Sequence, residues 1–134
     1  MKTIAFVGLG AMGRPMARNL LNAGFKVQGY DVNPAGLADL KAAGGTPAGS
    51  AKEAFAGADA IVLMVVNAAQ AEAVLFTDNA LDAAPADAIV CLMATCPPKQ
   101  VQDIAARVAA TGRRFVDSPV SGGVVGAAAG TLTI

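Results

Sequence analysis

The chain of 134 residues carries ten basic and ten acidic residues, and it contains no histidine. This length suits one domain with a hydrophobic core of useful size. The balanced charge argues against a basic surface that binds nucleic acid. The missing histidine excludes a histidine general base, a Ser-His triad and a His-ligated metal site within this chain.

The first thirty residues predict a strand, a glycine-rich turn, a helix and a second strand. The strand expected over residues 2–7, apolar from Ile4 to Val7, runs into the G-x-G-x-x-G turn Gly8-Leu9-Gly10-Ala11-Met12-Gly13. Gly8 permits a tight turn, Gly10 lets a pyrophosphate approach the backbone, and Gly13 lets helix and strand pack closely. The helix expected over residues 11–23 offers unpaired N–H groups and a positive dipole end to phosphates.

An acid follows the second strand, which is expected over residues 25–30. Asp31 lies close to the spacing of about 20 residues at which a carboxylate accepts hydrogen bonds from an adenosine ribose. We therefore predict a dinucleotide-binding site. The alternative is a glycine turn that binds nothing, which leaves Asp31 unexplained.

Helices and strands continue to alternate along the chain. Helices are expected from Asn33 to Gly44, from Ser50 to Ala56, and over residues 68–76 and 97–110. Strands are expected over residues 46–48, 60–66, 88–93 and 113–116, and a polar surface loop over residues 77–87. This pattern predicts an α/β fold of three layers, in which helices cover both faces of a doubly wound, mostly parallel Rossmann-type sheet.

The C-terminal residues contain a second glycine-rich motif. Ser121, Gly122 and Gly123 present a hydroxyl and uncovered N–H groups after a parallel strand, at the edge where ligands bind in such sheets. Successive N–H groups form a nest suited to a carboxylate, although a flexible glycine loop is an equal alternative. The sequence stops at Ile134 within an expected strand over residues 131–134, which predicts a truncated chain.

The two cysteines, Cys91 and Cys96, are too few for a disulfide framework and lack partners for a zinc site. No apolar run approaches the roughly 20 residues of a membrane span, and no secretory signal is present. We expect a cytoplasmic protein with no metal, membrane or nucleic-acid partner.

Two motifs together resemble the β-hydroxyacid dehydrogenase family, which includes 3-hydroxyisobutyrate dehydrogenase. Residues 8–19 read Gly-Leu-Gly-Ala-Met-Gly-Arg-Pro-Met-Ala-Arg-Asn, and residues 117–123 read Asp-Ser-Pro-Val-Ser-Gly-Gly. Residues 65–70 resemble the L-threonate dehydrogenase branch of that family. The resemblance implies that residues 1–134 are a Rossmann-type NAD-binding domain, incomplete at its C-terminal end and lacking the family's helical substrate and dimerisation domain.

The resemblance also implies which residues bind the cofactor. Pyrophosphate binding is implied for Gly8, Leu9, Gly10, Ala11, Met12 and Gly13. Asp31 would hold the ribose and favour NAD over NADP, because a carboxylate repels a 2′-phosphate. Val66 and Asn67 would line the path towards the nicotinamide, and Thr95 would lie beside that ring. Ala94 departs from the family's Ser-Thr pair by lacking a hydroxyl.

The implied reaction is the oxidation of a small 3-hydroxy acid, such as 3-hydroxyisobutyrate or L-threonate, with NAD by a homo-oligomeric parent enzyme. Ser121, Gly122 and Gly123 would hold the substrate carboxylate. The family's catalytic lysine would lie beyond Ile134, so no catalytic residue is expected in this chain and no turnover by it alone. The alternative function is a non-catalytic NAD(P)-sensing or docking module, which would not need a substrate-carboxylate loop. Binding of FAD is disfavoured, because segments typical of flavin enzymes are absent.

Overall fold

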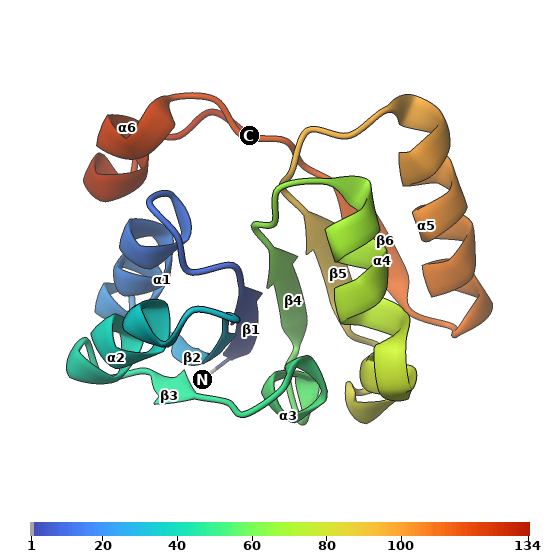
Figure 1. The fold of residues 1–134 in the computed structure, drawn as a ribbon, viewed down its shortest axis with the longest axis horizontal. Coiled ribbons are helices and arrows are strands. Elements are labelled where there is room, and N and C mark those ends of the chain that lie inside the picture. Colours follow the sequence, from blue (N-terminus) through green and yellow to red (C-terminus); the bar gives the residue numbers. More distant parts are fainter. Residues whose placement is uncertain (1) are drawn as a thin grey trace.

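A computed structural model describes residues 2–134 and shows a twisted parallel sheet flanked by helices (Figure 1). The strands are β1 (Thr3–Val7), β2 (Lys26–Tyr30), β3 (Thr46–Pro47), β4 (Ala60–Leu63), β5 (Ile89–Leu92) and β6 (Arg114–Asp117). Their order is β3-β2-β1-β4-β5-β6, and every pair is parallel. This is the strand order of a Rossmann fold, so the predicted fold class is confirmed.

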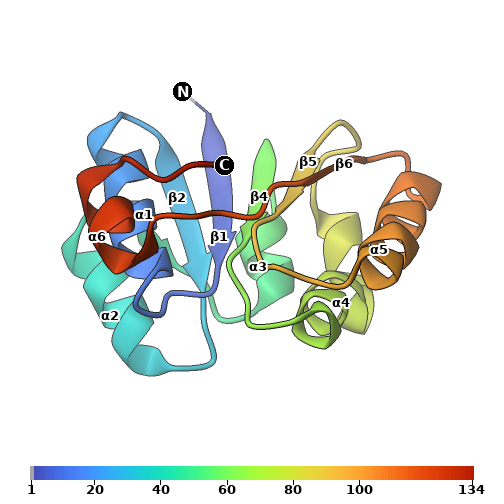
Figure 2. The same cartoon turned by 90° about the horizontal axis from the view of Figure 1, so that it is seen from above.

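The helices divide between the two faces of the sheet (Figure 2). They are α1 (Gly13–Asn22), α2 (Pro34–Ala42), α3 (Ala51–Phe55), α4 (Ala68–Phe76), the 3₁₀ helix η1 (Thr77–Ala83), α5 (Pro98–Ala110) and α6 (Gly123–Ala129). Right-handed crossovers place α1 and α2 on one face, while α4 and α5 lie on the other, because the chain moves across the sheet in opposite directions from β1 and from β4.

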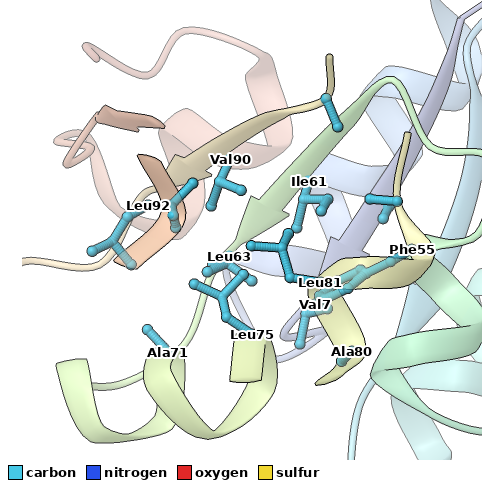
Figure 3. Close-up of a cluster of buried hydrophobic side chains, with 14 of the residues drawn as sticks. Val7, Phe55, Ile61, Leu63, Ala71, Leu75, Ala80, Leu81, Val90 and Leu92 are labelled. Atoms are coloured by element: carbon cyan, nitrogen blue, oxygen red, sulfur yellow. The ribbon is translucent and has the colours of Figure 1, made fainter. Parts of the chain in front are cut away.

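The larger hydrophobic cluster fills the space between the sheet and helices α3, α4 and α5 (Figure 3). Ile61 and Leu63 of β4 meet Leu75 of α4 and Phe55 of α3 there, and all four side chains are fully buried. Alternate residues of a strand face opposite ways, so Val62 joins the smaller cluster beneath α1 and α2 instead. Burial of this apolar surface is the main stabilising contribution to the fold.

The strand expected over residues 60–66 ends early, at Leu63. Its neighbour β1 ends at Val7, which pairs with Leu63, and the carbonyl of Val7 accepts a last hydrogen bond of 2.8 Å from the Met64 N–H. Beyond that point β4 has no partner on this side, because the chain turns away at Gly8. Val66 is therefore 79% exposed instead of lying in a central strand.

The expectation of a polar surface loop over residues 77–87 is wrong for residues 77–83 and holds only for residues 84–87. Residues Thr77–Ala83 form the 3₁₀ segment η1, which is kinked at Asp78 and Asn79 and in which Ala80 and Leu81 are buried. Both side chains belong to the larger hydrophobic cluster, as Figure 3 shows. Packing of these two residues folds a segment whose polar neighbours suggested a loop.

Residues 131–134 do not add a strand to the sheet, contrary to the expectation. Thr133 instead forms an isolated antiparallel bridge with Ser121. Between these two residues the glycine- and alanine-rich segment forms the helix α6, which ends at Gly130 in the left-handed conformation. The chain therefore turns back on itself after β6.

A nearly buried arginine joins β6 to the loop before β5. Arg113 has a side chain only 9% exposed. Its Nη2 donates to the carbonyl of Ala84 at 2.6 Å, and its Nε donates to the carbonyl of Pro85 at 3.1 Å. The carbonyl of Pro85 also accepts a hydrogen bond of 3.1 Å from the Ala88 N–H, so the bond to Ala84 is the one that satisfies an otherwise unpaired acceptor among the described residues.

We expect Arg113→Met to lower the free energy of unfolding by about 2–3 kcal/mol, because the carbonyl of the buried Ala84 loses its donor and that of Pro85 loses one of two. Urea denaturation measures this change. The exposed neighbour Arg114 makes one side-chain bond, to the carbonyl of Asp87, and Arg114→Met should cost less than about 1 kcal/mol. Equal losses at both positions would contradict this role for Arg113.

Candidate functional site

The three glycines of the first turn have different surroundings. Gly8 has a φ of +97°, and a Cβ there would collide with the carbonyl oxygen of Met64. A Cβ on Gly13 would collide with the carbonyl oxygen of Gly8. A Cβ on Gly10, in contrast, would meet no atom within 4 Å. The turn and packing roles predicted for Gly8 and Gly13 are thus confirmed, whereas the fold leaves the space beside Gly10 open.

A cleft of about 410 Å³ opens beside Gly10 at the carboxyl ends of the strands. Gly8, Gly10 and Asp31 line one side of it, and Val65 and Val66 line the other. The cleft lies between the halves of the sheet that begin with β1 and β4, where the strand order reverses. Open α/β sheets bind their ligands at this switch point, and the volume is within the usual range of roughly 300–1,000 Å³.

Asp31 connects the first turn to the end of β2. Its Oδ2 accepts a hydrogen bond of 2.6 Å from the Leu9 N–H, and its Oδ1 accepts one of 2.8 Å from the Asn33 N–H. Each carboxylate oxygen can accept a further bond, so both remain available to hydroxyl groups in the cleft. No lysine or arginine lines this cleft within residues 2–134, and Lys52 lines a neighbouring pocket that shares Tyr30 and Val32 with it.

The start of α1 supplies unpaired donors next to the same cleft. No hydrogen bond within the described part of the chain uses the N–H of Ala11 or Met12. The first turn of α1 holds no acidic residue, so the positive end of the helix dipole is not neutralised locally. Arg14 donates from Nε to the carbonyl of Leu9 at 2.8 Å, a contact that braces the turn and that sequence reasoning missed. Free donors and positive charge of this kind suit a phosphate.

The opposite wall is held by the cap of α4. The Oδ1 of Asn67 accepts from the Gln70 N–H at 2.9 Å, and the Oε1 of Gln70 accepts from the Val66 N–H at 3.0 Å. Val66 lines the cleft, as does Gln70, while Asn67 serves as the N-cap. Sequence reasoning missed Gln70, although the spacing of a capping residue and a glutamine three positions later is a known signal.

The remaining predicted site residues lie at the same edge of the sheet but outside this cleft. Thr95 is exposed in the loop after β5. Ser121, Gly122 and Gly123 are exposed after β6, and both glycines have positive φ values, of 133° and 62°. Because parallel strands end at one edge, these loops face the same side of the domain as Gly10.

The cysteines do not resemble catalytic nucleophiles. Burial raises the pKa of the Cys91 thiol, and burial followed by the charge of Asp117 raises the pKa of the Cys96 thiol. A raised pKa disfavours the thiolate, the reactive form. Within residues 2–134, no cluster of three or more His, Cys, Asp or Glu side chains is arranged to hold a metal ion. The described helices include none that is both long and apolar enough to cross a bilayer.

Comparison with known proteins places this geometry in a family. Residues 3–134 match the family model described as the NAD binding domain of 6-phosphogluconate dehydrogenase. A Pseudomonas aeruginosa protein named NAD-dependent L-serine dehydrogenase is 42% identical over 99% of this chain and 45% of its own length. The L-threonate dehydrogenase of Cupriavidus necator is 41% identical over 99% of this chain and 45% of its length.

A solved structure agrees with these relatives. Mycobacterium tuberculosis 3-hydroxyisobutyrate dehydrogenase, determined with L-serine, has a TM-score of 0.93 and 39% identity, over 98% of this chain and 45% of that chain. The chain thus spans just under half the length of the relatives it matches. It belongs to the family of NAD-binding domains found in the 3-hydroxyisobutyrate dehydrogenase-like enzymes.

Proposed function

We propose that residues 1–134 are the NAD-binding domain of a dehydrogenase that oxidises a small 3-hydroxy acid, and that the helical domain of the family lies outside them. The observation that carries this proposal is the open space at Gly10 beside the carboxylate of Asp31. Among the described glycines, Gly10 alone has both open space and an ordinary φ, so neither packing nor backbone conformation explains the glycine there.

The residues at the cleft fit the parts of a dinucleotide. The N–H groups of Ala11 and Met12 would donate to the pyrophosphate, which passes over the bare Cα of Gly10. Gly8, Leu9 and Gly13 would shape that turn, and Asp31 would accept hydrogen bonds from the adenosine ribose. The 2′-phosphate of NADP would meet the Asp31 carboxylate, and this repulsion between like charges favours NAD.

The other predicted residues would serve the reacting end. Val66 and Asn67 would border the path to the nicotinamide, and Thr95 would contact that ring, which accepts hydride when the dinucleotide is bound. Ser121, Gly122 and Gly123 would bind the substrate carboxylate. L-serine, L-threonate and 3-hydroxyisobutyrate, the compounds named by the relatives, all combine a carboxylate with a hydroxyl group.

The group that removes the hydroxyl proton would come from residues beyond Ile134. None of the chain's own lysines lies in the sequence motif of the family's catalytic lysine, which supports a base supplied from elsewhere. A homo-oligomer and a cytoplasmic location remain predictions for the complete gene product.

Gly10→Ala should weaken binding of NAD by about tenfold or more, because one badly placed methyl at the pyrophosphate costs at least 1.4 kcal/mol. The melting temperature should not change, since Gly10 has an ordinary φ and open space. Gly13→Ala is the matched variant, and its contact with the Gly8 carbonyl should lower the free energy of unfolding by about 1–3 kcal/mol. Calorimetric titration and thermal unfolding measure the two effects. Unchanged NAD affinity in Gly10→Ala would contradict the proposed path of the pyrophosphate.

Asp31→Asn should lower the affinity for NAD by about tenfold and bring NAD and NADP closer together, because the charge is lost while an acceptor for Leu9 remains. Titration calorimetry with each dinucleotide tests this. The exposed Asp103 of α5 gives the control variant Asp103→Asn, which should bind both as the wild type does. Tighter binding of NADP than of NAD by the wild type would refute the role of Asp31.

Residues 1–134 alone should form no NADH from NAD and L-serine, L-threonate or 3-hydroxyisobutyrate, because the family's catalytic lysine would lie outside them. Absorbance of NADH is the measurement, with the complete gene product as the positive control. Clear turnover by the 134-residue chain would disprove the inferred position of the base.

A further inference from the structure

Residues 119–134 fold into a small unit after β6. Ser121 and Thr133 exchange two backbone hydrogen bonds of 2.9 Å, and the Thr131 N–H donates to the carbonyl of Gly126 at 2.9 Å. A Cβ on Gly122 would lie 3.1 Å from the Cδ2 of Leu132, so the returning segment packs closely on the start of α6. The unit holds the Ser121-Gly122-Gly123 loop in one shape through its own contacts.

A single side chain bonds this unit to the rest of the domain. Within residues 2–134, only two hydrogen bonds join residues 119–134 to the other elements, and both come from Asn19 of α1. Its Nδ2 donates to the carbonyl of Ala127 at 2.7 Å and to that of Ala128 at 3.4 Å. These carbonyls belong to the last turn of α6, where that of Ala127 also accepts a longer hydrogen bond of 3.4 Å from the Gly130 N–H.

The contact joins parts of the sequence more than a hundred residues apart. Both views show α6 beside α1 (Figures 1 and 2). Strand β6, which precedes α6 in the chain, lies on the opposite side of the molecule. Ala127 of α6 is buried, with 1% of its surface exposed. Gly130 lies next to the same amide, since a Cβ there would be 3.5 Å from the Asn19 Nδ2.

We propose that Asn19 is a positioning residue, which holds the Ser121-Gly122-Gly123 loop in register with the dinucleotide turn. Helix α1 begins at that turn, and Asn19 lies about 9 Å further along its axis. Helix α6 is a rigid spacer of about 6–8 Å between the bonded carbonyls and Gly123. A bond at one end of α6 therefore sets the place of the loop at the other end. This inference rests on the proposed function, in which that loop binds the substrate carboxylate.

The test compares Asn19→Ala and Asn19→Asp in the complete gene product. The aspartate keeps the shape of asparagine but turns a carboxylate towards two carbonyls, so it removes the bonds without leaving a cavity. Among L-serine, L-threonate and 3-hydroxyisobutyrate, the acid that the wild type oxidises fastest is the substrate. Its KM should rise about tenfold, the effect of one lost hydrogen bond of roughly 1.4 kcal/mol. The kcat should fall less than KM rises, and the Kd for NAD should stay within about twofold.

Three further comparisons separate positioning from simple stability. Asn22→Ala changes an exposed amide on the same helix, and it should leave KM unchanged. Asn19→Gln keeps the donor on a longer side chain and should recover part of the lost affinity. Amide hydrogen exchange at Ser121 and Thr131 should accelerate in Asn19→Ala and Asn19→Asp, while exchange in β1 and β4 should not.

The inference is overturned if KM stays at the wild-type value in both variants. It is also overturned if KM and the Kd for NAD rise in proportion, which would indicate a general loss of structure. If the wild type oxidises none of the three acids, the proposed function fails. Exchange at Ser121 and Thr131 then decides by itself whether Asn19 holds the loop, and unchanged exchange would reject it.

Discussion

The close approach of three backbone segments at the end of β1 is the constraint on which the rest of the site depends. Gly8 lies against the carbonyl of Met64, and Gly13 lies against the carbonyl of Gly8. Side chains at either position would force β4 or α1 away from β1. The halves of the sheet could then not meet where the strand order reverses, and the cleft beside Gly10 would lose its walls. Packing at two glycines thus creates the free space at the third.

Hydrogen bonds then convert this packed turn into a polar site. Asp31 accepts from the Leu9 N–H, which ties the carboxylate to the turn, and Arg14 donates to the Leu9 carbonyl from the other side. The N–H groups at the start of α1 remain unpaired among the described residues. Negative charge at the ribose end and free donors at the phosphate end match the two halves of an adenosine diphosphate group.

The domain also carries parts that a dinucleotide alone would not require. The unit of residues 119–134 leaves the sheet after β6, crosses to α1 and is bonded there by Asn19. Helix α1 therefore has two contacts of consequence: its first turn faces the cleft, and its second half holds the loop that we assign to the substrate carboxylate. Placing both loops on one rigid helix would keep cofactor and substrate in a constant geometry.

The amino-acid sequence by itself determined the fold class, the roles of Gly8 and Gly13 in the turn and the place of Asp31 after β2. These features are local: a strand of apolar residues, a glycine at a tight turn and a capping residue act on their immediate neighbours. Only the tertiary structure decided where β4 ends, since the residues after Leu63 have no partner in β1, which ends at Val7.

The tertiary structure alone also decided the burial of Leu81 and the bonds of Arg113 and Asn19. Each depends on a partner that is distant in the chain, and the local pattern of apolar and polar residues does not indicate which residue that partner is. Asn19 is the clearest case, because its neighbours in the sequence mark it only as a polar residue on a helix. Its hydrogen-bond partners are the carbonyls of residues 127 and 128, which only the tertiary fold brings next to α1.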